Sequence, residues 1–183
     1  MPEAASRIMP QVPAAPWLAA LPPAMRFILH GDQGVRNTAA PIWGAEFAEE
    51  SCRARTRDSR ATLWLGPDEY LLLGFDDSAK DSAAAALESG LADAPHALVD
   101  ISHRQFGLEV TGPHAEVILN GACPLDLSSA EFPVGMCTRT VLAKADIVLW
   151  RTREDAFHLE VWRSFNGYVT GLLREIAREF YVE

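Results

Sequence analysis

The sequence has few cysteines, and their spacing is not that of a metal site. Its 183 residues include three, namely Cys52, Cys123 and Cys137, and no two have the short separation found in zinc sites. The five histidines are spread through the chain without an HxH or HExxH pair. We therefore expect no metal site. An odd number of cysteines predicts reduced thiols that pack as small buried side chains. Cys123 and Cys137 are candidates for near neighbours.

Long hydrophobic runs and glycine-rich loops are also missing. No apolar run approaches the roughly 18 residues that a membrane span requires. The N-terminal segment is interrupted by prolines and does not have the pattern of a signal peptide. No GxGxxG or Walker-type loop predicts a dinucleotide or ATP site. Together these absences predict a cytoplasmic protein with no membrane partner.

Basic residues are outnumbered. The chain has 16 Lys and Arg against 25 Asp and Glu, which gives a formal net charge of -9. Nucleic acid is therefore not an expected partner, since phosphate binding needs a basic surface. One local cluster, formed by Arg53, Arg55, Arg57 and Arg60, is interpreted as a solvated loop, with phosphate or partner docking as the alternative.

What the sequence has in quantity is apolar residues, at 49%, enough for a packed core. Residues 1–25 are rich in Pro and Ala, and we expect a partly disordered or partner-docking arm there. The core strands are expected to begin at Arg26. Residues 26–183 are predicted to form one domain, in two related halves at about 26–101 and 102–183.

Hairpins alternate with short helices along this domain. Asp76 is expected to cap one helix and Ser164 another, because short oxygen-bearing side chains bind free amides of the first turn. The pattern predicts an α+β fold with two βαβ-type halves, antiparallel or mixed sheets, and helices on one face. Strands are expected at Arg26–His30, Ala61–Leu65, Tyr70–Leu73, Ala97–Ile101, Phe106–Thr111, Gly135–Ala143, Asp146–Trp150 and Phe157–Trp162, and helices at Ala79–Leu91, His114–Asn120 and Ser164–Phe180.

Candidate catalytic residues are few. Asp100, Ser102 and His103 have the side chains of a nucleophilic triad. They are nearly consecutive, however, and neighbours on a strand point to opposite faces. We interpret them as a structural connector that hydrogen-bonds to local backbone. The pair Asp76 and Asp77 is interpreted as a helix cap rather than as an acid–base pair. No catalytic or cofactor-binding residue is predicted.

An interface is the best-supported kind of site. Trp162, Arg163 and Phe165 precede the last expected helix, and Trp and Arg are enriched among interface anchors. The alternative is that these residues fasten the last helix to the sheet.

Five segments, in order, resemble the gamma subunit family of heterotetrameric sarcosine oxidase and, more broadly, the aminomethyltransferase fold. The resemblance covers roughly residues 26–179. Its segments are LWLGPDEYLLL (Leu63–Leu73), VDISHRQFGLEVTGP (Val99–Pro113), CPLDL (Cys123–Leu127), FPVGMCTRT (Phe132–Thr140) and VWRSFNGYV (Val161–Val169).

The resemblance implies a folate-binding-domain-like fold and a subunit without cofactors of its own. It implies alpha, beta and delta partner subunits, with FAD, FMN, NAD and tetrahydrofolate on other chains. That complex oxidises sarcosine to glycine and passes the one-carbon unit to tetrahydrofolate. The glycine turn and Asp pair of active folate enzymes are missing here. The alternatives are a freestanding folate-binding protein of one-carbon metabolism and a gamma-type subunit of another N-methyl amino acid oxidase or dehydrogenase.

Overall fold

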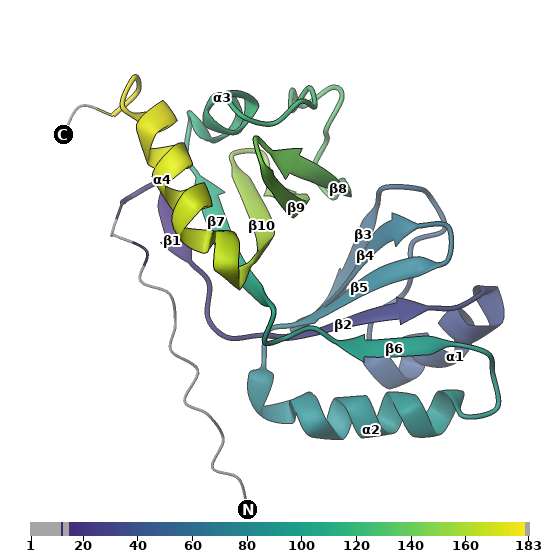
Figure 1. The fold of residues 1–183 in the computed structure, drawn as a ribbon. Coiled ribbons are helices and arrows are strands. Elements are labelled where there is room, and N and C mark those ends of the chain that lie inside the picture. Colours follow the sequence, from purple (N-terminus) through teal and green to yellow (C-terminus); the bar gives the residue numbers. More distant parts are fainter. Residues whose placement is uncertain (1–11, 13–14, 182–183) are drawn as a thin grey trace, which may run out of the picture.

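The computed structural model describes residue 12 and residues 15–181, which form two antiparallel sheets flanked by helices (Figure 1). Within these residues each sheet has five strands, and this confirms the α+β class. Sheet A has the order β1 (Leu18–Ala20), β7 (Gln105–Thr111), β10 (Ala156–Trp162), β9 (Ala145–Arg153), β8 (Cys137–Leu142). Sheet B has the order β3 (Ala54–Arg57), β4 (Arg60–Gly66), β5 (Glu69–Gly74), β2 (Met25–His30), β6 (Ala97–Asp100).

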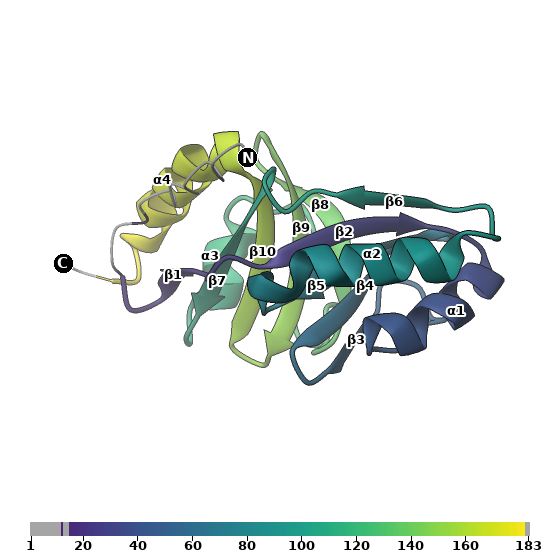
Figure 2. The ribbon, with the colours of Figure 1, turned by 90° about the horizontal axis from the view of Figure 1, so that it is seen from below.

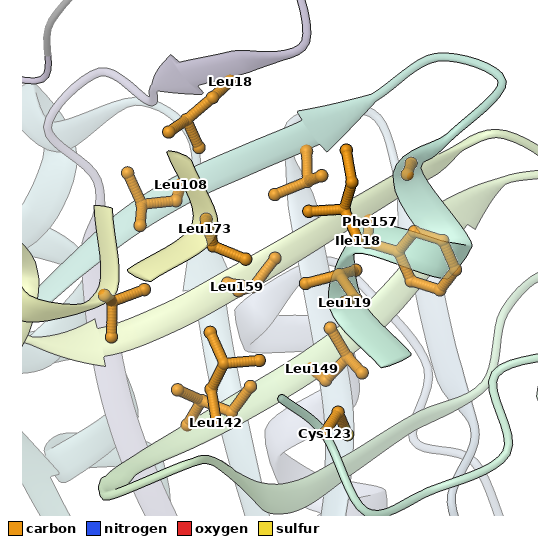
Figure 3. Close-up of a cluster of buried hydrophobic side chains, with 14 of the residues drawn as sticks. Leu18, Leu108, Ile118, Leu119, Cys123, Leu142, Leu149, Phe157, Leu159 and Leu173 are labelled. Atoms are coloured by element: carbon orange, nitrogen blue, oxygen red, sulfur yellow. The ribbon is translucent and has the colours of Figure 1, made fainter. Parts of the chain in front are cut away.

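The sheets face each other, and the helices cover their outer faces (Figures 1 and 2). Helices α1 (Gln33–Trp43) and α2 (Lys80–Leu91) pack on sheet B around Phe27 and Leu72. Helices α3 (Ala115–Asn120) and α4 (Asn166–Ala177) pack on sheet A, where Leu18, Ile118 and Leu173 share one apolar cluster (Figure 3). A third cluster fills the seam between the sheets. The helices on one face of each sheet were expected.

The two sheets are built by the same succession of elements. Sheet B follows β2-α1-β3-β4-β5-α2-β6, and sheet A follows β7-α3-β8-β9-β10-α4. Strands β2 and β7 occupy equivalent positions, each beside the edge strand of its sheet. That edge strand is β6 in sheet B, whereas in sheet A it is β1, which pairs with β7 through Leu18 and Val110. The first strand of the described residues therefore completes the sheet that the second half of the chain builds.

The expectation that the core strands begin at Arg26 is wrong. Strand β1 precedes that residue, and both Trp17 and Leu18 are buried in the sheet A cluster. The indole of Trp17 stacks on the ring of Tyr181, with centroids 5.7 Å apart. Most of the expected arm, residues 1–11 and 13–14, lies outside the described residues.

Helix α1 was not predicted, because Asp32 and Gly34 resemble a turn. The Asp32 side chain instead accepts a hydrogen bond from the Val35 amide at 3.0 Å and caps the helix. Gly44, with φ at 88°, ends the helix in the left-handed conformation that glycine tolerates. Val35, Ala39 and Trp43 are buried at intervals of four residues, which is the helical signal in this stretch.

Two further expectations need correction. The arginine cluster at residues 53–60 lies largely in the hairpin of β3 and β4 rather than in a loop. Ser164 does not cap the last helix, because it lies inside a 3-10 turn, η2 (Arg163–Phe165), and α4 begins at Asn166 without a side-chain cap. The expected cap at Asp76 is confirmed: its carboxylate accepts from the Ser78 amide at 3.0 Å, at the 3-10 turn η1 (Asp77–Ala79) before α2.

Candidate functional site

Three exposed aromatic side chains gather where β10 leads into α4. Trp162, Phe165 and Tyr168 are 42%, 39% and 40% exposed, and we call them the aromatic surface. Phe165 and Tyr168 meet edge to face with ring centroids 6.4 Å apart. The guanidinium of Arg104 lies 5.1 Å from the Trp162 ring centre. Large exposed aromatics beside an arginine are typical of residues that anchor protein–protein interfaces.

Arg163 behaves differently from its neighbours Trp162 and Phe165. Its Nε donates to the carbonyl of His103 at 3.0 Å, and its backbone amide donates to the carbonyl of Arg104 at 2.8 Å. Arg163 therefore braces the connection between the two sheets. Of the three predicted interface residues, Arg163 thus binds the connector between β6 and β7, whereas Trp162 and Phe165 are exposed.

A buried group of charges lies on the inner face of both sheets. Arg26, on β2 of sheet B, reaches across the seam, where its Nε lies 2.5 Å from Oε2 of Glu160, on β10 of sheet A. The other Glu160 oxygen lies 2.7 Å from Nε2 of His158. All three residues are at most 4% exposed. We call this set the seam triad.

Electrostatics keeps Glu160 ionised inside the protein. Burial alone would raise its pKa, but the Arg26 charge and the His158 hydrogen bond outweigh burial and lower the pKa below its usual range. Gly107, opposite Glu160 on β7, makes room for the arginine, because an added Cβ would lie 2.9 Å from Nη2 of Arg26. Sequence reasoning missed the triad. Its signal is the polar residues on the second face of two otherwise apolar strands, β2 and β10.

Asp100, Ser102 and His103 lie at the connector between β6 and β7. Ser102 Oγ accepts from the Arg26 amide at 2.8 Å, and the Ser102 amide donates to Asp100 Oδ1 at 2.8 Å. Asp100 also binds the Lys80 ammonium at 2.8 Å. His103 contributes its backbone carbonyl to Arg163. The three side chains are not assembled as nucleophile, base and orienting acid.

A second ion pair crosses the seam nearer the surface. Arg139 of β8 binds the carboxylate of Glu69 of β5 through both terminal nitrogens, one of them at 2.7 Å. The hydrogen bond from Arg139 lowers the pKa of Glu69.

Two hollows accompany these features. One, of about 260 Å³, lies in the seam beside Arg104, Gln105 and Trp162, and the Gln105 Oε1 atom is buried without a hydrogen-bond partner. This volume is below the roughly 300–1,000 Å³ of typical small-molecule sites. A second hollow, of about 800 Å³, lies between the Trp17 segment and α4, next to residues outside the described ranges.

Neither hollow holds a cluster suited to a metal ion. Within the described residues, no group of three or more His, Cys, Asp or Glu side chains is arranged to bind one. Over the same part of the chain, no helix combines the length and apolar character that crossing a membrane demands.

Sarcosine oxidase gamma subunits are similar in sequence to this chain over about two thirds of its length. The gamma subunit of sarcosine oxidase from Corynebacterium sp. (strain P-1) is 34% identical over 126 residues, which cover 69% of this chain and 61% of the relative. The Arthrobacter sp. gamma subunit is 35% identical over 127 residues, again 69% and 61%. The chain thus spans about three fifths of the length of these relatives.

Solved structures give the same picture. A chain of the heterotetrameric sarcosine oxidase from Corynebacterium sp. U-96, in complex with pyrrole 2-carboxylate, superposes with a TM-score of 0.83 at 27% identity, over 91% of this chain and 85% of that one. Aminomethyltransferase T of the glycine cleavage system from Bartonella henselae superposes at 0.65, with 13% identity over 85% of this chain and 44% of its own. The second likeness concerns the fold alone.

A family model matches residues 51–179, from the turn before β3 through α4. This range contains the aromatic surface and both acidic partners of the ion pairs across the seam. The family that it describes is the sarcosine oxidase, gamma subunit family. The match extends over more than half of the chain, so the chain belongs to the sarcosine oxidase gamma subunit family.

Proposed function

We propose that this chain is a non-catalytic gamma subunit of a heterotetrameric sarcosine oxidase and that it acts by docking. Its membership of the gamma subunit family and its likeness to a chain of such a complex support this role. The connector also supports a non-catalytic role. The side chains of Asp100 and Ser102 form hydrogen bonds with backbone amides and with Lys80 rather than with the groups of a reaction site.

The partners in this proposal are alpha, beta and delta subunits. FAD, FMN, NAD and tetrahydrofolate belong to those chains, where sarcosine is oxidised to glycine and the one-carbon unit is transferred. This chain contributes buried surface. A stable interface of this kind buries upward of about 1,200 Å² in total.

The aromatic surface is the observation that carries the proposal. Trp162, Phe165 and Tyr168 present apolar area at the start of α4, and Arg104 lies beside Trp162 with its cation over the ring. A few such residues supply most of the binding free energy in an interface. The backbone that carries these rings lies in β10, η2 and α4, so little backbone order has to be gained on docking.

The test is co-expression with the three other subunits, followed by size-exclusion chromatography. Trp162→Ala and Phe165→Ala should each weaken association by at least tenfold, because a buried aromatic anchor contributes about 2 kcal/mol or more. Val117→Ala is the matched control: Val117 is 43% exposed on α3, outside the aromatic surface. Melting temperatures of the isolated variants should stay close to that of the parent chain.

If both aromatic variants co-elute as well as Val117→Ala does, the aromatic surface is not the dock. The variant Arg163→Ala tests whether Arg163 stabilises the fold of this chain or contacts a partner subunit. Because its side chain binds the His103 carbonyl, we expect a lower melting temperature of the isolated chain.

Two measurements test the non-catalytic assignment. The purified chain should be colourless and should produce no peroxide from sarcosine; a flavin absorption band would contradict the proposal. Calorimetric titration with tetrahydrofolate should show no binding at micromolar ligand. A one-to-one isotherm would favour the freestanding folate-binding alternative instead.

A further inference from the structure

Two cysteines lie opposite each other in the backbone pairing where the sheets join. The turn before β3 runs antiparallel to the start of β8: the Ala54 amide donates to the Gly135 carbonyl and the Cys137 amide donates to the Cys52 carbonyl, each at 2.9 Å. Arg53 and Met136 form the bridge between these hydrogen bonds. In an antiparallel pair, one step back on one strand matches one step forward on the other. Cys52 is therefore directly opposite Cys137.

This placement is compatible with a disulfide bond. Directly opposite residues in antiparallel pairs have Cα atoms about 4.5–5.5 Å apart, and their side chains lie on the same side. Disulfides require Cα separations of about 4.4–6.8 Å. Cys52 has φ at 59°, in the left-handed region, so its side chain departs from regular strand geometry. A cross-link formed there is expected to be easily reduced.

The two thiols differ in accessibility. Cys52 is partly exposed, whereas Cys137 is fully buried in the seam, with its sulfur 3.6 Å from the Trp64 carbonyl oxygen. Burial raises the pKa of the Cys137 thiol to about 12. An oxidant in solution therefore meets Cys52 first.

The third cysteine is on the other side of sheet A. Cys123 packs in the cluster under α3 and α4 (Figure 3), whereas Cys137 packs in the seam cluster. The sequence suggested Cys123 and Cys137 as near neighbours, and the sheet separates them. Of the other two cysteines, Cys52 is therefore the one that lies opposite Cys137 in the backbone pairing.

We propose that Cys52 and Cys137 form a reversible disulfide that links sheet B to sheet A. The oxidant is a hydroperoxide. The Cys52 thiolate attacks the peroxide oxygen, which breaks the O–O bond and gives a sulfenic acid and an alcohol or water. The Cys137 sulfur then attacks the Cys52 sulfur, the S–S bond forms, and the hydroxyl group leaves as water with the Cys137 proton. Two thiols are oxidised and one peroxide is reduced. This modification site does not depend on the proposed function.

The test treats the full-length reduced chain with hydrogen peroxide and counts thiols after denaturation. The count should fall from three to one, and dithiothreitol should restore it. Peptide mapping without reductant should find Cys52 joined to Cys137. Cys123→Ala is the control, and its count should fall from two to zero with the same joined peptides.

Cys137→Ala identifies the order of steps. It should leave a sulfenic acid on Cys52 that dimedone traps, with no cross-link. Should this variant fail to fold, the peptide map of the parent chain still decides the question. A linked pair that includes Cys123, a disulfide only between two chains, or loss of thiols without any linked peptides would overturn the proposal.

The pH dependence gives a second arm. Below a pKa of about 12, the thiolate fraction of Cys137 changes about tenfold per pH unit. If Cys137 resolves the sulfenic acid, cross-linking at saturating peroxide should be about ten times faster at pH 8 than at pH 7. A rate that does not change over this interval would contradict Cys137 as the resolving thiol.

Discussion

At the scale of single residues, the seam triad is the feature with the largest energetic consequence. Arg26 and Glu160 are charged and buried, and each has lost its hydration. Their attraction offsets that loss only while both partners are present, so removal of one leaves the other uncompensated. The triad is therefore a sensitive point in the contact between the sheets, although it is weak support for overall stability.

Glu160→Gln is predicted to destabilise the fold by about 3 kcal/mol, because it keeps the side-chain shape but leaves the Arg26 charge without a counter-ion. Urea denaturation of the purified chain measures the change. Glu175→Gln is the control: Glu175 pairs with Arg178, both side chains are mostly exposed, and we expect a change within about 0.5 kcal/mol. Equal effects of the two substitutions would refute the importance of burial here.

The lowered pKa of Glu160 predicts that the stability of the fold depends on pH. The folded-state pKa of Glu160 is depressed from the ordinary value of 4.5. A depressed carboxyl pKa contributes stability above the unfolded-state value, and that contribution is lost as the pH falls through the folded-state value. The difference in unfolding free energy between the parent chain and Glu160→Gln should therefore be constant near neutral pH and shrink below about pH 4.5. Urea titrations at a series of pH values test this, and a gap that widens on acidification would contradict it.

At the scale of elements, α4 holds two glycines, Gly167 and Gly171, on its exposed side. An added Cβ at either position would meet nothing within 4 Å. Glycine inside a helix is less favourable than alanine by about 0.5–1 kcal/mol. Helix α4, which carries part of the aromatic surface, is thus less stable than it would be with alanine at these two positions.

Gly171→Ala should raise the melting temperature of the isolated chain by a few degrees. Gly112→Ala should lower it, since Gly112 has φ at 100°, where a side chain is strained. Circular dichroism during heating distinguishes the two. A lower melting temperature for Gly171→Ala would show that the added methyl group meets neighbouring atoms at this position, which would contradict the prediction.

Elements with clear periodicity could be predicted from the sequence. The hairpins β4–β5 and β9–β10 and helix α2 were found with errors of a few residues at their ends, because alternating apolar residues and alanine-rich runs are local signals. Strand β1 and helix α1 were missed. The first has three residues and no alternation of its own, and the second contains Pro41 and begins with turn-like residues.

In the candidate site, too, features within one segment could be predicted from the sequence, whereas contacts between distant segments could not. The sequence identified Trp162 and Phe165 because aromatic residues before a helix are visible in one segment. The seam triad joins residues from β2 and β10. The opposed cysteines come from the turn before β3 and from β8. Pairs that distant in sequence depend on how the sheets pack, which local patterns do not contain.

At the scale of the whole molecule, sheet A takes one edge strand from the N-terminal part of the chain. Strand β1 serves sheet A while the rest of the N-terminal half builds sheet B. The residues at the two ends of the described chain are close, because Trp17 stacks on Tyr181. Adjacent ends are the condition under which circular permutation preserves a fold.

A circularly permuted chain tests whether β1 can complete sheet A from the other end of the sequence. It begins at Ala24, continues to Tyr181, passes through a short Gly/Ser linker and ends with residues 15–23. Each sheet is then encoded by one continuous segment, and we expect native circular dichroism with a melting temperature within about 5 °C of the parent, as for a change of roughly 1 kcal/mol. The same segment 24–181 without residues 15–23 is the control and should be much less stable, because it lacks β1. A permuted chain no more stable than this control would show that β1 does not complete sheet A.

The position of β1 also has a consequence while the protein is being synthesised. All strands of sheet B leave the ribosome as one stretch, so that sheet can fold early. Strand β1 emerges before them and has no partner until β7 is made, after the whole of sheet B. An unpaired strand in a nascent chain invites pairing with the wrong neighbour. The three-residue length of β1, with Pro16 before it and Pro22 and Pro23 after it, limits that risk, because proline cannot donate to a strand ladder.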